Sequence, residues 1–295
     1  MDNNTRAALV LSIFKRDNNF DLDKILNESI SYSEILKLPI NTLEKYGFSK
    51  VEAMALKEID KSFCINSYLK YLQINGINYC CLGQDKYPKS LLSIYNPPIV
   101  LYYRGEIEYD YDSSLAIVGG RIHSNYVNVI LRDIKKVVRS YNLVIVSGLA
   151  IGTDSLAHKL ALASNCKTIA IIGSGLDYDS FYPKSNWLLA KQIVSNNGLL
   201  ISEYPPHTKA NKLNFPRRNR IIAGLSKTVM VLEARHRSGA LITAREASEQ
   251  GKEVVSVPGN YYLEYSKGTN WLISQGAKIY CSDKDLAELY KQLDT

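Results

Sequence analysis

The residues of this chain that are best suited to chemistry are cations gathered in a stretch without acidic neighbours. Between Tyr204 and Leu232 the sequence has no Asp or Glu, and the aromatic residue Phe215 lies among the cations. Clustered positive charge attracts polyanions, and an aromatic ring offers a surface on which a base can stack. The pattern favours binding of single-stranded nucleic acid without covalent chemistry. The cations are Lys209, Lys212, Arg217, Arg218, Arg220 and Lys227.

The composition is that of a folded protein with a mild excess of positive charge. The 295 residues are 46% apolar, which is enough for one large core or for a large core and a small domain. Residues 1–100 carry 12 basic and 11 acidic side chains, so most of the net charge of +7 lies beyond residue 100. Because an excess of this size is also common in proteins that bind no nucleic acid, the net charge alone does not indicate a nucleic-acid-binding protein.

The cysteines and the apolar runs exclude several classes of protein. The five cysteines form no Cys-x-x-Cys pair and have no nearby histidine cluster, which argues against a zinc site and against a disulfide framework. Arg6, Lys15 and Arg16 interrupt the first 20 residues, and no apolar run approaches the about 18 residues of a membrane span. We therefore expect a cytoplasmic protein without metal, cofactor or membrane contact.

Residues 1–62 are expected to form a small all-helical domain. Thr5 suits the cap of a first helix, and Ser49 with Glu52 forms a capping box for a later one. A helix, a glycine turn and a helix are typical of SAM and helix-hairpin-helix domains. Plain packing and a helix-hairpin-helix contact with DNA both stay open, although the paired glycines of that motif are absent.

From Ser113 onward, apolar strands alternate with amphipathic helices. The strands are apolar throughout, as in a parallel sheet that helices cover on both faces. This alternation predicts a doubly wound α/β domain with a mostly parallel sheet. The predicted strands are residues 115–118, 143–146, 168–172, 199–201, 228–232, 253–257 and 278–280.

Glycines and small polar residues follow several of these strands. Gly119-Gly120-Arg121 comes after the first strand, Ser147-Gly148 after the second, and Ser238-Gly239 shortly after the fifth. The carboxyl ends of parallel strands meet at one edge of the sheet, where ligands bind. Glycines let backbone amides approach a ligand, and the helices that begin near Asp154 and Gly239 direct their positive dipole ends to the same edge. The sequence therefore predicts a phosphate-binding rim.

Each member of this rim also has an ordinary explanation. Glycines after strands are often only tight turns, Asp154 suits a helix N-cap, and His158 suits the apolar face of a helix. Residues 173–175 begin like a dinucleotide fingerprint, but residues 176–178 do not supply its third glycine. The prediction of a phosphate-binding rim therefore depends on the whole set of residues and not on any single one of them.

Taken together, these residues resemble the DNA-processing protein A family (DprA, also called Smf) of bacterial transformation and recombination. The match extends over most of residues 76–281, and its most specific parts are the motifs at residues 215–226 and 238–244. The resemblance implies that residues 63–295 form an extended Rossmann-like domain that binds single-stranded DNA and makes a homodimer. It also implies a recombination mediator that protects incoming strands and loads the RecA recombinase during natural transformation.

The family's binding residues carry over to particular positions. Arg121 resembles a phosphate-contacting arginine, Lys212 resembles a second basic contact, and Phe215 resembles the aromatic that meets a base. Arg218, Asn219 and Arg220 are expected to line the same groove, although one of these arginines can instead pair with Glu203 or Glu233. The predicted site for single-stranded DNA comprises Gly119, Gly120, Arg121, Gly148, Lys212, Phe215, Arg218, Asn219, Arg220, Ser238 and Gly239.

Two positions depart from the family pattern. Gly120 stands where the family usually has a serine, and Ile151 stands where it has an arginine. The second change weakens the phosphate rim unless Arg235 or Arg237 compensates. We also expect no C-terminal winged-helix domain of the kind that some members add.

Two other functions stay open. Related Rossmann-like enzymes hydrolyse nucleoside monophosphates with a glycine-rich loop and a glutamate, and Glu233 would be that glutamate here. Residues 234–239 lack the Pro-Gly-Gly run of those enzymes, and neither Glu203 nor Glu233 has a second carboxylate at metal-ligand spacing, which favours pairing with arginines. The other alternative, a structural protein whose rim holds a stray anion, fits poorly with the acid-free basic stretch.

Overall fold

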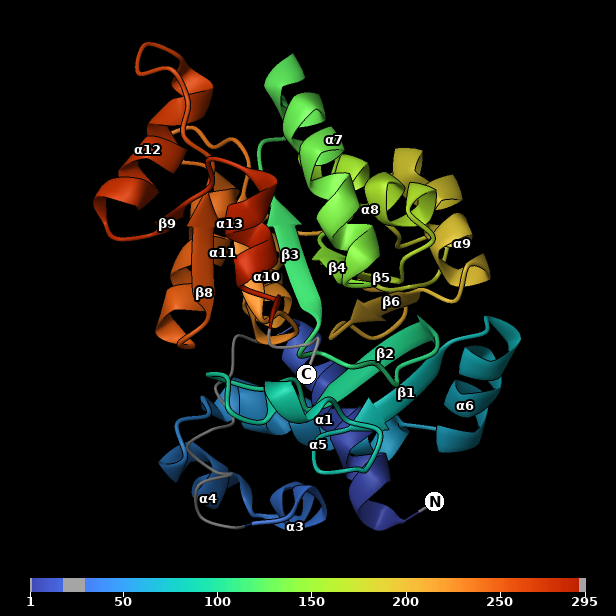
Figure 1. Ribbon diagram of the computed structural model, residues 1–295. Coiled ribbons are helices and arrows are strands. Elements are labelled where there is room, and N and C mark those ends of the chain that lie inside the picture. Colours follow the sequence, from blue (N-terminus) through green and yellow to red (C-terminus); the bar gives the residue numbers. More distant parts are fainter. Residues whose placement is uncertain (1, 18–29, 292–295) are drawn as a thin grey trace.

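The computed structural model describes residues 2–17 and 30–291, and within them helices flank one nine-stranded sheet (Figure 1). The strands are β1 (Asn78–Cys81), β2 (Val100–Gly105), β3 (Ser114–Val118), β4 (Val144–Ser147), β5 (Thr168–Ile171), β6 (Leu199–Ser202), β7 (Thr228–Val231), β8 (Glu253–Ser256) and β9 (Lys278–Ile279).

The strand order across the sheet is β1-β2-β6-β5-β4-β3-β7-β8-β9. All neighbours from β6 to β9 pair in parallel, whereas β2 is antiparallel to both β1 and β6. The prediction of a doubly wound, mostly parallel α/β fold is confirmed. Strands β1 and β2, which are not among the predicted strands, extend the sheet with antiparallel pairs at one edge.

Helices cover both faces of the sheet. On one face lie α7 (Asn125–Ser140), α8 (Thr153–Ala163) and α9 (Trp187–Ser195), and on the other lie α10 (Asn214–Gly224) and α11 (Gly239–Glu249). Successive strand residues point to opposite faces, so Ile145 packs in a cluster with α7 and α8, whereas Val146 packs in a cluster with α10 and α11. Because both faces are covered, the middle residues of the strands are apolar, and polar residues such as Ser114, Ser147 and Glu253 stand at strand ends. The other elements of this part are α12 (Lys267–Ser274), α13 (Asp283–Glu288), and the short 3-10 helices η1 (Lys89–Leu91), η2 (Lys184–Asn186) and η3 (Glu264–Ser266).

The winding of the chain reverses between β3 and β7. From β3 the chain moves through β4 and β5 to β6, and α10 then returns it to β7 on the other side of β3. The loops that follow β3 and β7 therefore leave in opposite directions and open a crevice at the carboxyl ends of the two strands. Ligands of open α/β sheets bind at such a switch point.

The N-terminal region is helical. It contains α1 (Asn3–Asp17), α3 (Tyr32–Lys37), α4 (Ile40–Lys45), α5 (Lys50–Ser62) and α6 (Ile65–Ile74). The capping box of Ser49 and Glu52 at the start of α5 is confirmed. The expectation that Thr5 caps the first helix is wrong: α1 begins at Asn3, and the Asp2 carboxylate accepts from the Thr5 amide at 2.7 Å.

The helical region and the sheet share one hydrophobic cluster. Leu9 and Phe14 of α1 lie in the same cluster of buried residues as Tyr102 of β2 and Leu200 of β6. The Ser12 hydroxyl is also hydrogen-bonded to the Tyr102 hydroxyl at 2.7 Å. The proposed boundary between residues 62 and 63 remains a prediction, and residues 1, 18–29 and 292–295 of the two predicted domains lie outside the described residues. Within the described residues, no helix combines the length and apolar character needed to span a membrane.

Candidate nucleic-acid interface

A groove runs along the carboxyl edge of the sheet at the switch point between β3 and β7. Arg121 after β3, Lys212 before α10 and Phe215 in the first turn of α10 all line it. We call it the switch-point groove. It joins the three residues on which the sequence prediction depended most. The predicted residues Gly119, Arg218, Asn219, Ser238 and Gly239 line it as well.

The Phe215 ring occupies a defined place in this groove. The Arg121 guanidinium carbon lies 5.5 Å from the centre of the ring, within the range of a cation–π contact. The neighbouring Asn214 side chain donates to the Gly173 carbonyl at 3.1 Å, and a Cβ on Gly173 would lie only 3.2 Å from the ring. Gly173 therefore leaves room for the ring at the carboxyl end of β5. The ring is half-buried, so one part of it stays open to a ligand.

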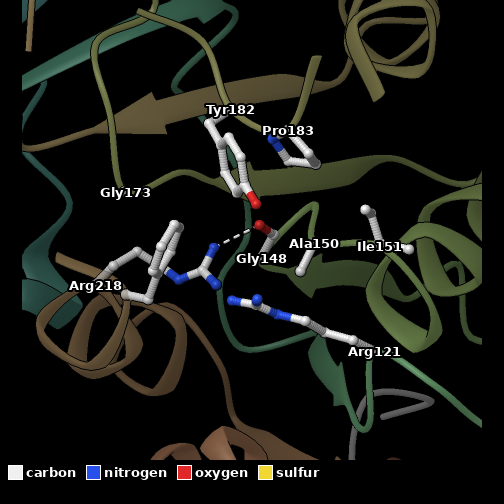
Figure 2. Close-up of a pocket in the computed structure, with 9 residues that line it drawn as sticks. Arg121, Gly148, Ala150, Ile151, Gly173, Tyr182, Pro183 and Arg218 are labelled. Carbon is white, nitrogen blue, oxygen red and sulfur yellow. Dashed lines mark hydrogen bonds between the residues drawn. The ribbon is translucent and has the colours of Figure 1, made fainter. Parts of the chain in front are cut away.

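A smaller hollow behind Phe215 continues the groove (Figure 2). The guanidinium groups of Arg121 and Arg218 point towards each other in it, and Tyr182 and Pro183 form the opposite wall. The centres of the Tyr182 and Phe215 rings are 5.7 Å apart at an interplanar angle of 49°. The two rings thus meet at an angle and form a corner.

Backbone contacts interlock the loops that carry these residues. The Thr153 amide at the start of α8 donates to the Gly120 carbonyl at 3.2 Å, and the Gly120 amide donates to the Glu233 carbonyl at 3.0 Å. Gly152 has a φ of +89°, and a Cβ there would lie 2.4 Å from the Arg121 carbonyl oxygen. A Cβ on Gly119 would likewise lie 2.7 Å from Thr153 Oγ1. These glycines allow the loops after β3 and β4 to touch, and so fix the position of Arg121.

Arg218 lies in the floor of the groove and has a structural task. Its side chain is buried and donates to the carbonyl groups of Gly148 and Ile171. A Cβ on Gly148 would overlap the Arg218 guanidinium, so the glycine at 148 is needed for this contact. Burial lowers the pKa of Arg218, while the charge of nearby Asp154 opposes this shift. The charge of Arg218 adds to the positive potential of the groove from below.

Asn219 and Arg220 take different places. Asn219 lines the groove, and its side-chain amide donates to the Gly239 carbonyl at 3.2 Å, which ties α10 to α11. The expectation that Arg220 lines the groove is not supported, because its guanidinium pairs with Glu203 and donates to the Asn96 carbonyl at 2.8 Å. Both side chains of this ion pair are only 9% exposed. Burial alone would raise the pKa of Glu203, but Arg220 holds it below its ordinary value.

The basic stretch is divided between opposite edges of the sheet. Lys212 is exposed at the groove, whereas Lys227 directly precedes β7 and therefore lies at the amino end of that strand. The Lys227 ammonium lies 5.4 Å from the centre of the Tyr290 ring. The stretch consequently does not act as one surface, and Lys212 is its exposed contribution to the groove.

The side chains of Glu233, Asp154 and His158 all have hydrogen-bond partners within the fold. Glu233 is buried and accepts from the Ser124 amide at 2.8 Å and from the Ser124 hydroxyl, so it holds the start of α7. The N-cap of α8 is Gly152, so the expectation that Asp154 is the cap is wrong; its carboxylate is buried in the first turn and accepts from the Ala150 amide. His158 is confirmed as a core histidine, with Nδ1 2.7 Å from the Thr168 hydroxyl. In the described part of the chain, no cluster of three or more His, Cys, Asp or Glu side chains is placed to hold a metal ion.

Comparison with known proteins assigns the chain to a family. Residues 78–291 match the model of the family described as DNA recombination-mediator protein A. The chain belongs to this family. It is 38% identical to the DNA processing protein DprA of Streptococcus pneumoniae, over 91% of this chain and 96% of that protein. It is 36% identical to the DprA protein of Bacillus subtilis, over 89% of this chain and 92% of that protein.

Solved structures agree with this assignment. The structure of DprA from Streptococcus pneumoniae superposes with a TM-score of 0.75 at 34% identity and covers 98% of both chains. DNA processing protein A from Helicobacter pylori superposes with a TM-score of 0.63 at 28% identity, over 74% of this chain and 96% of that one. The work on the Helicobacter pylori protein concerns its mode of binding single-stranded DNA.

This DprA-family site contains one departure from the family pattern that the sequence revealed, Ile151, and two aromatic residues that it did not assign to the site, Tyr182 and Tyr265. Ile151 is 52% exposed and lines the hollow beside Tyr182, so an apolar side chain stands where the family pattern led us to expect a cation. Tyr182 lines both the switch-point groove and the smaller hollow. Arg235 and Arg237 lie on the far side of Arg121, around a hollow that also contains Tyr265. No periodicity in the sequence signals the position of Tyr265, because the fold alone brings it there.

Proposed function

We propose that the protein binds single-stranded DNA in the switch-point groove and performs no covalent chemistry on it. The observation that carries the proposal is that Arg121, Lys212 and Phe215 line the same groove. Arg121 and Lys212 neutralise phosphates and release counterions, and Phe215 stacks on a base. A single aromatic ring accepts any base, so affinity depends on salt and little on sequence.

The relatives support this ligand. The Helicobacter pylori protein, which shares the fold, is studied for its binding of single-stranded DNA, and the family itself is described as a recombination mediator. We therefore propose that the protein protects incoming single strands in the cytoplasm and loads the RecA recombinase onto them during natural transformation. This role requires a contact with the recombinase in addition to the groove.

We also propose that the protein acts as a homodimer through the α/β domain. Strand β9 forms one edge of the sheet, and Ile279 on it is 47% exposed. Trp271 of α12, close to this edge in sequence, is 46% exposed. An open strand edge and exposed large apolar side chains each favour association with a second copy. Sedimentation velocity of the protein and of the Ile279→Lys variant tests this: the variant should be monomeric at concentrations at which the wild type is a dimer.

The geometry around Glu233 does not favour the alternative function as a hydrolase. A glutamate that attacks or activates water at a sugar needs a free oxygen facing the substrate. Ser124 donates to both carboxylate oxygens of Glu233 and holds them towards α7. Incubation of the protein with nucleoside monophosphates should release no free base, and release that is abolished by Glu233→Gln would overturn the proposal.

Fluorescence anisotropy with a labelled oligonucleotide of mixed sequence tests the binding site. Single strands should bind much better than duplex, and Lys212→Ala should weaken binding and reduce the slope of log affinity against log salt by about 0.7. Lys227→Ala is the matched control, since it removes the same charge from the same stretch at the opposite edge of the sheet. Equal effects of the two variants would contradict the assignment of the groove.

A further inference from the structure

A second hollow adjoins the switch-point groove on the far side of Arg121. Arg121 and Ser238 line both, so the two form one continuous surface at the carboxyl ends of β3 and β7. We call it the Tyr265 hollow. The side chains that matter for its chemistry are Arg121, Arg235, Arg237, Tyr265 and Glu233.

Arg235 and Tyr265 repeat the arrangement of Arg121 and Phe215. The Arg235 guanidinium carbon lies 4.9 Å from the centre of the Tyr265 ring, and its Nη2 donates to the Tyr265 hydroxyl at 3.4 Å. The corresponding distance from Arg121 to the Phe215 ring is 5.5 Å. Each pair offers an aromatic face for a base and an adjacent guanidinium for a phosphate, which are the two contacts that a nucleotide of a single strand requires.

Hydrogen bonds hold the loop that carries Arg235 against the segment that carries Tyr265. The Ala234 amide donates to the Tyr265 carbonyl at 2.8 Å, and the Gly268 amide donates to the Ala234 carbonyl at 2.8 Å. A Cβ on Gly268 would lie 2.7 Å from that carbonyl oxygen, so only glycine lets the start of α12 approach the loop after β7. Arg235 and Tyr265 thus face each other before any ligand binds, which reduces the entropy cost of binding.

The charge of the Tyr265 hollow suits an anion. Arg235 and Arg237 are exposed, and within residues 2–17 and 30–291 neither forms an ion pair with a carboxylate. Glu233 is the acidic residue of the lining, and Ser124 binds its two oxygens. Glu264 lies near enough to be influenced by Arg235, but it pairs with Lys267. Positive charge therefore dominates the hollow.

We propose that the Tyr265 hollow is a second nucleotide subsite for the same DNA strand, with a base stacked on Tyr265 and a phosphate held by Arg235. The strand passes from Phe215 across Arg121 to Tyr265. This inference rests on the proposed function, since it assumes that the switch-point groove binds single-stranded DNA. In this proposal Arg235 also supplies, on the other side of Arg121, a positive charge that Ile151 does not supply in the hollow beside Tyr182.

Photocrosslinking tests the path of the strand. Oligo(dT) with one 5-iododeoxyuridine at successive positions is irradiated on the full-length protein, and the crosslinked residue is identified by mass spectrometry. We expect crosslinks to Phe215 and to Tyr265 from different positions of one oligonucleotide. Tyr265→Phe should keep the second crosslink, because it keeps the ring, and Tyr265→Leu should lose it without loss of the crosslink to Phe215. Crosslinks to Phe215 without any to Tyr265 would overturn the inference and leave the proposed function intact.

The salt dependence of binding tests the phosphate contact. Arg235→Ala should reduce the slope of log affinity against log salt by about 0.7 with long oligonucleotides, and should have no effect with oligonucleotides too short to pass Arg121. Arg245→Ala is the matched control, since Arg245 is an exposed arginine on α11 that pairs with Glu249. If Arg235→Ala behaves like Arg245→Ala while Lys212→Ala still weakens binding, the subsite is wrong. If Lys212→Ala also has no effect, the proposed function fails together with it.

Discussion

The Arg121 guanidinium lies over the Phe215 ring, although the two residues come from opposite sides of the winding reversal, after β3 and at the start of α10. The contact couples the phosphate-binding group to the stacking group of the proposed site. It holds Arg121 beside the ring. Backbone contacts from Thr153 and Glu233 to Gly120 keep the loop of Arg121 in place as well.

Replacement of Phe215 by leucine should lower the affinity for single-stranded DNA by about 1–3 kcal/mol, the contribution of one base stacked on an aromatic ring. Phe215→Trp should retain most of the affinity, because it retains an aromatic face. Anisotropy titrations at one salt concentration measure both, and thermal unfolding checks that the fold is intact. Equal affinity of the leucine variant and the wild type would show that no base meets this ring.

Replacement of Ile151 by arginine should increase affinity. Ile151 is exposed in the hollow beside Tyr182, so an arginine there adds one cation facing the proposed path of the strand. The slope of log affinity against log salt should become steeper by about 0.7. Val51→Arg is the control, since Val51 is 76% exposed on α5 in the helical region. A gain of the same size in both variants would mean that only net charge matters.

Replacement of Gly152 by alanine should disturb both stability and binding. The positive φ of Gly152 and the close Arg121 carbonyl leave no room for a Cβ, so we expect a loss of about 1–3 kcal/mol in the free energy of unfolding. Affinity for DNA should fall too, because the loop of Arg121 must move. Gly239→Ala is the control for stability: apart from its chain neighbours and the backbone of its own helix, no atom lies within 4 Å of a Cβ there, and its free energy of unfolding should not decrease.

The protein should become less stable as the pH decreases, because His158 is buried in its neutral form. Burial lowers the pKa of His158 to about 3 from 6.5, so the unfolded chain takes up this proton first as the pH falls. This contribution to stability is complete above pH 6.5, and it decreases by about 1.4 kcal/mol per pH unit on the way down to about pH 3. Urea titrations of the wild type and of His158→Asn at several pH values measure it. Parallel pH dependences in the two proteins would contradict the assignment.

Local sequence patterns were sufficient for the parallel strands from β3 to β9 and for the edge that carries the site. The strand at residues 228–232 is apolar from 229 to 232 because both of its faces are covered, and this run is visible in the sequence. The glycines after β3 and β4 are also visible in the sequence, and the structure gives the reason for them, since their two loops touch. Parallel strands all end at one edge, so the position of the rim follows from strand direction. The motifs at residues 215–226 and 238–244 independently indicated the family.

Only the tertiary structure decided which charged residues face the switch-point groove. Four cations of one basic stretch lie in four different places. Lys212 lines the groove, and Arg218 lies in its floor. Arg220 pairs with the buried Glu203, and Lys227 lies at the opposite edge of the sheet. A helix turns its residues to different sides, and the partner on each side comes from a distant strand or loop, so composition cannot assign them. The same holds for Tyr265, which reaches Arg235 only because Gly268 lets α12 pack against the loop after β7.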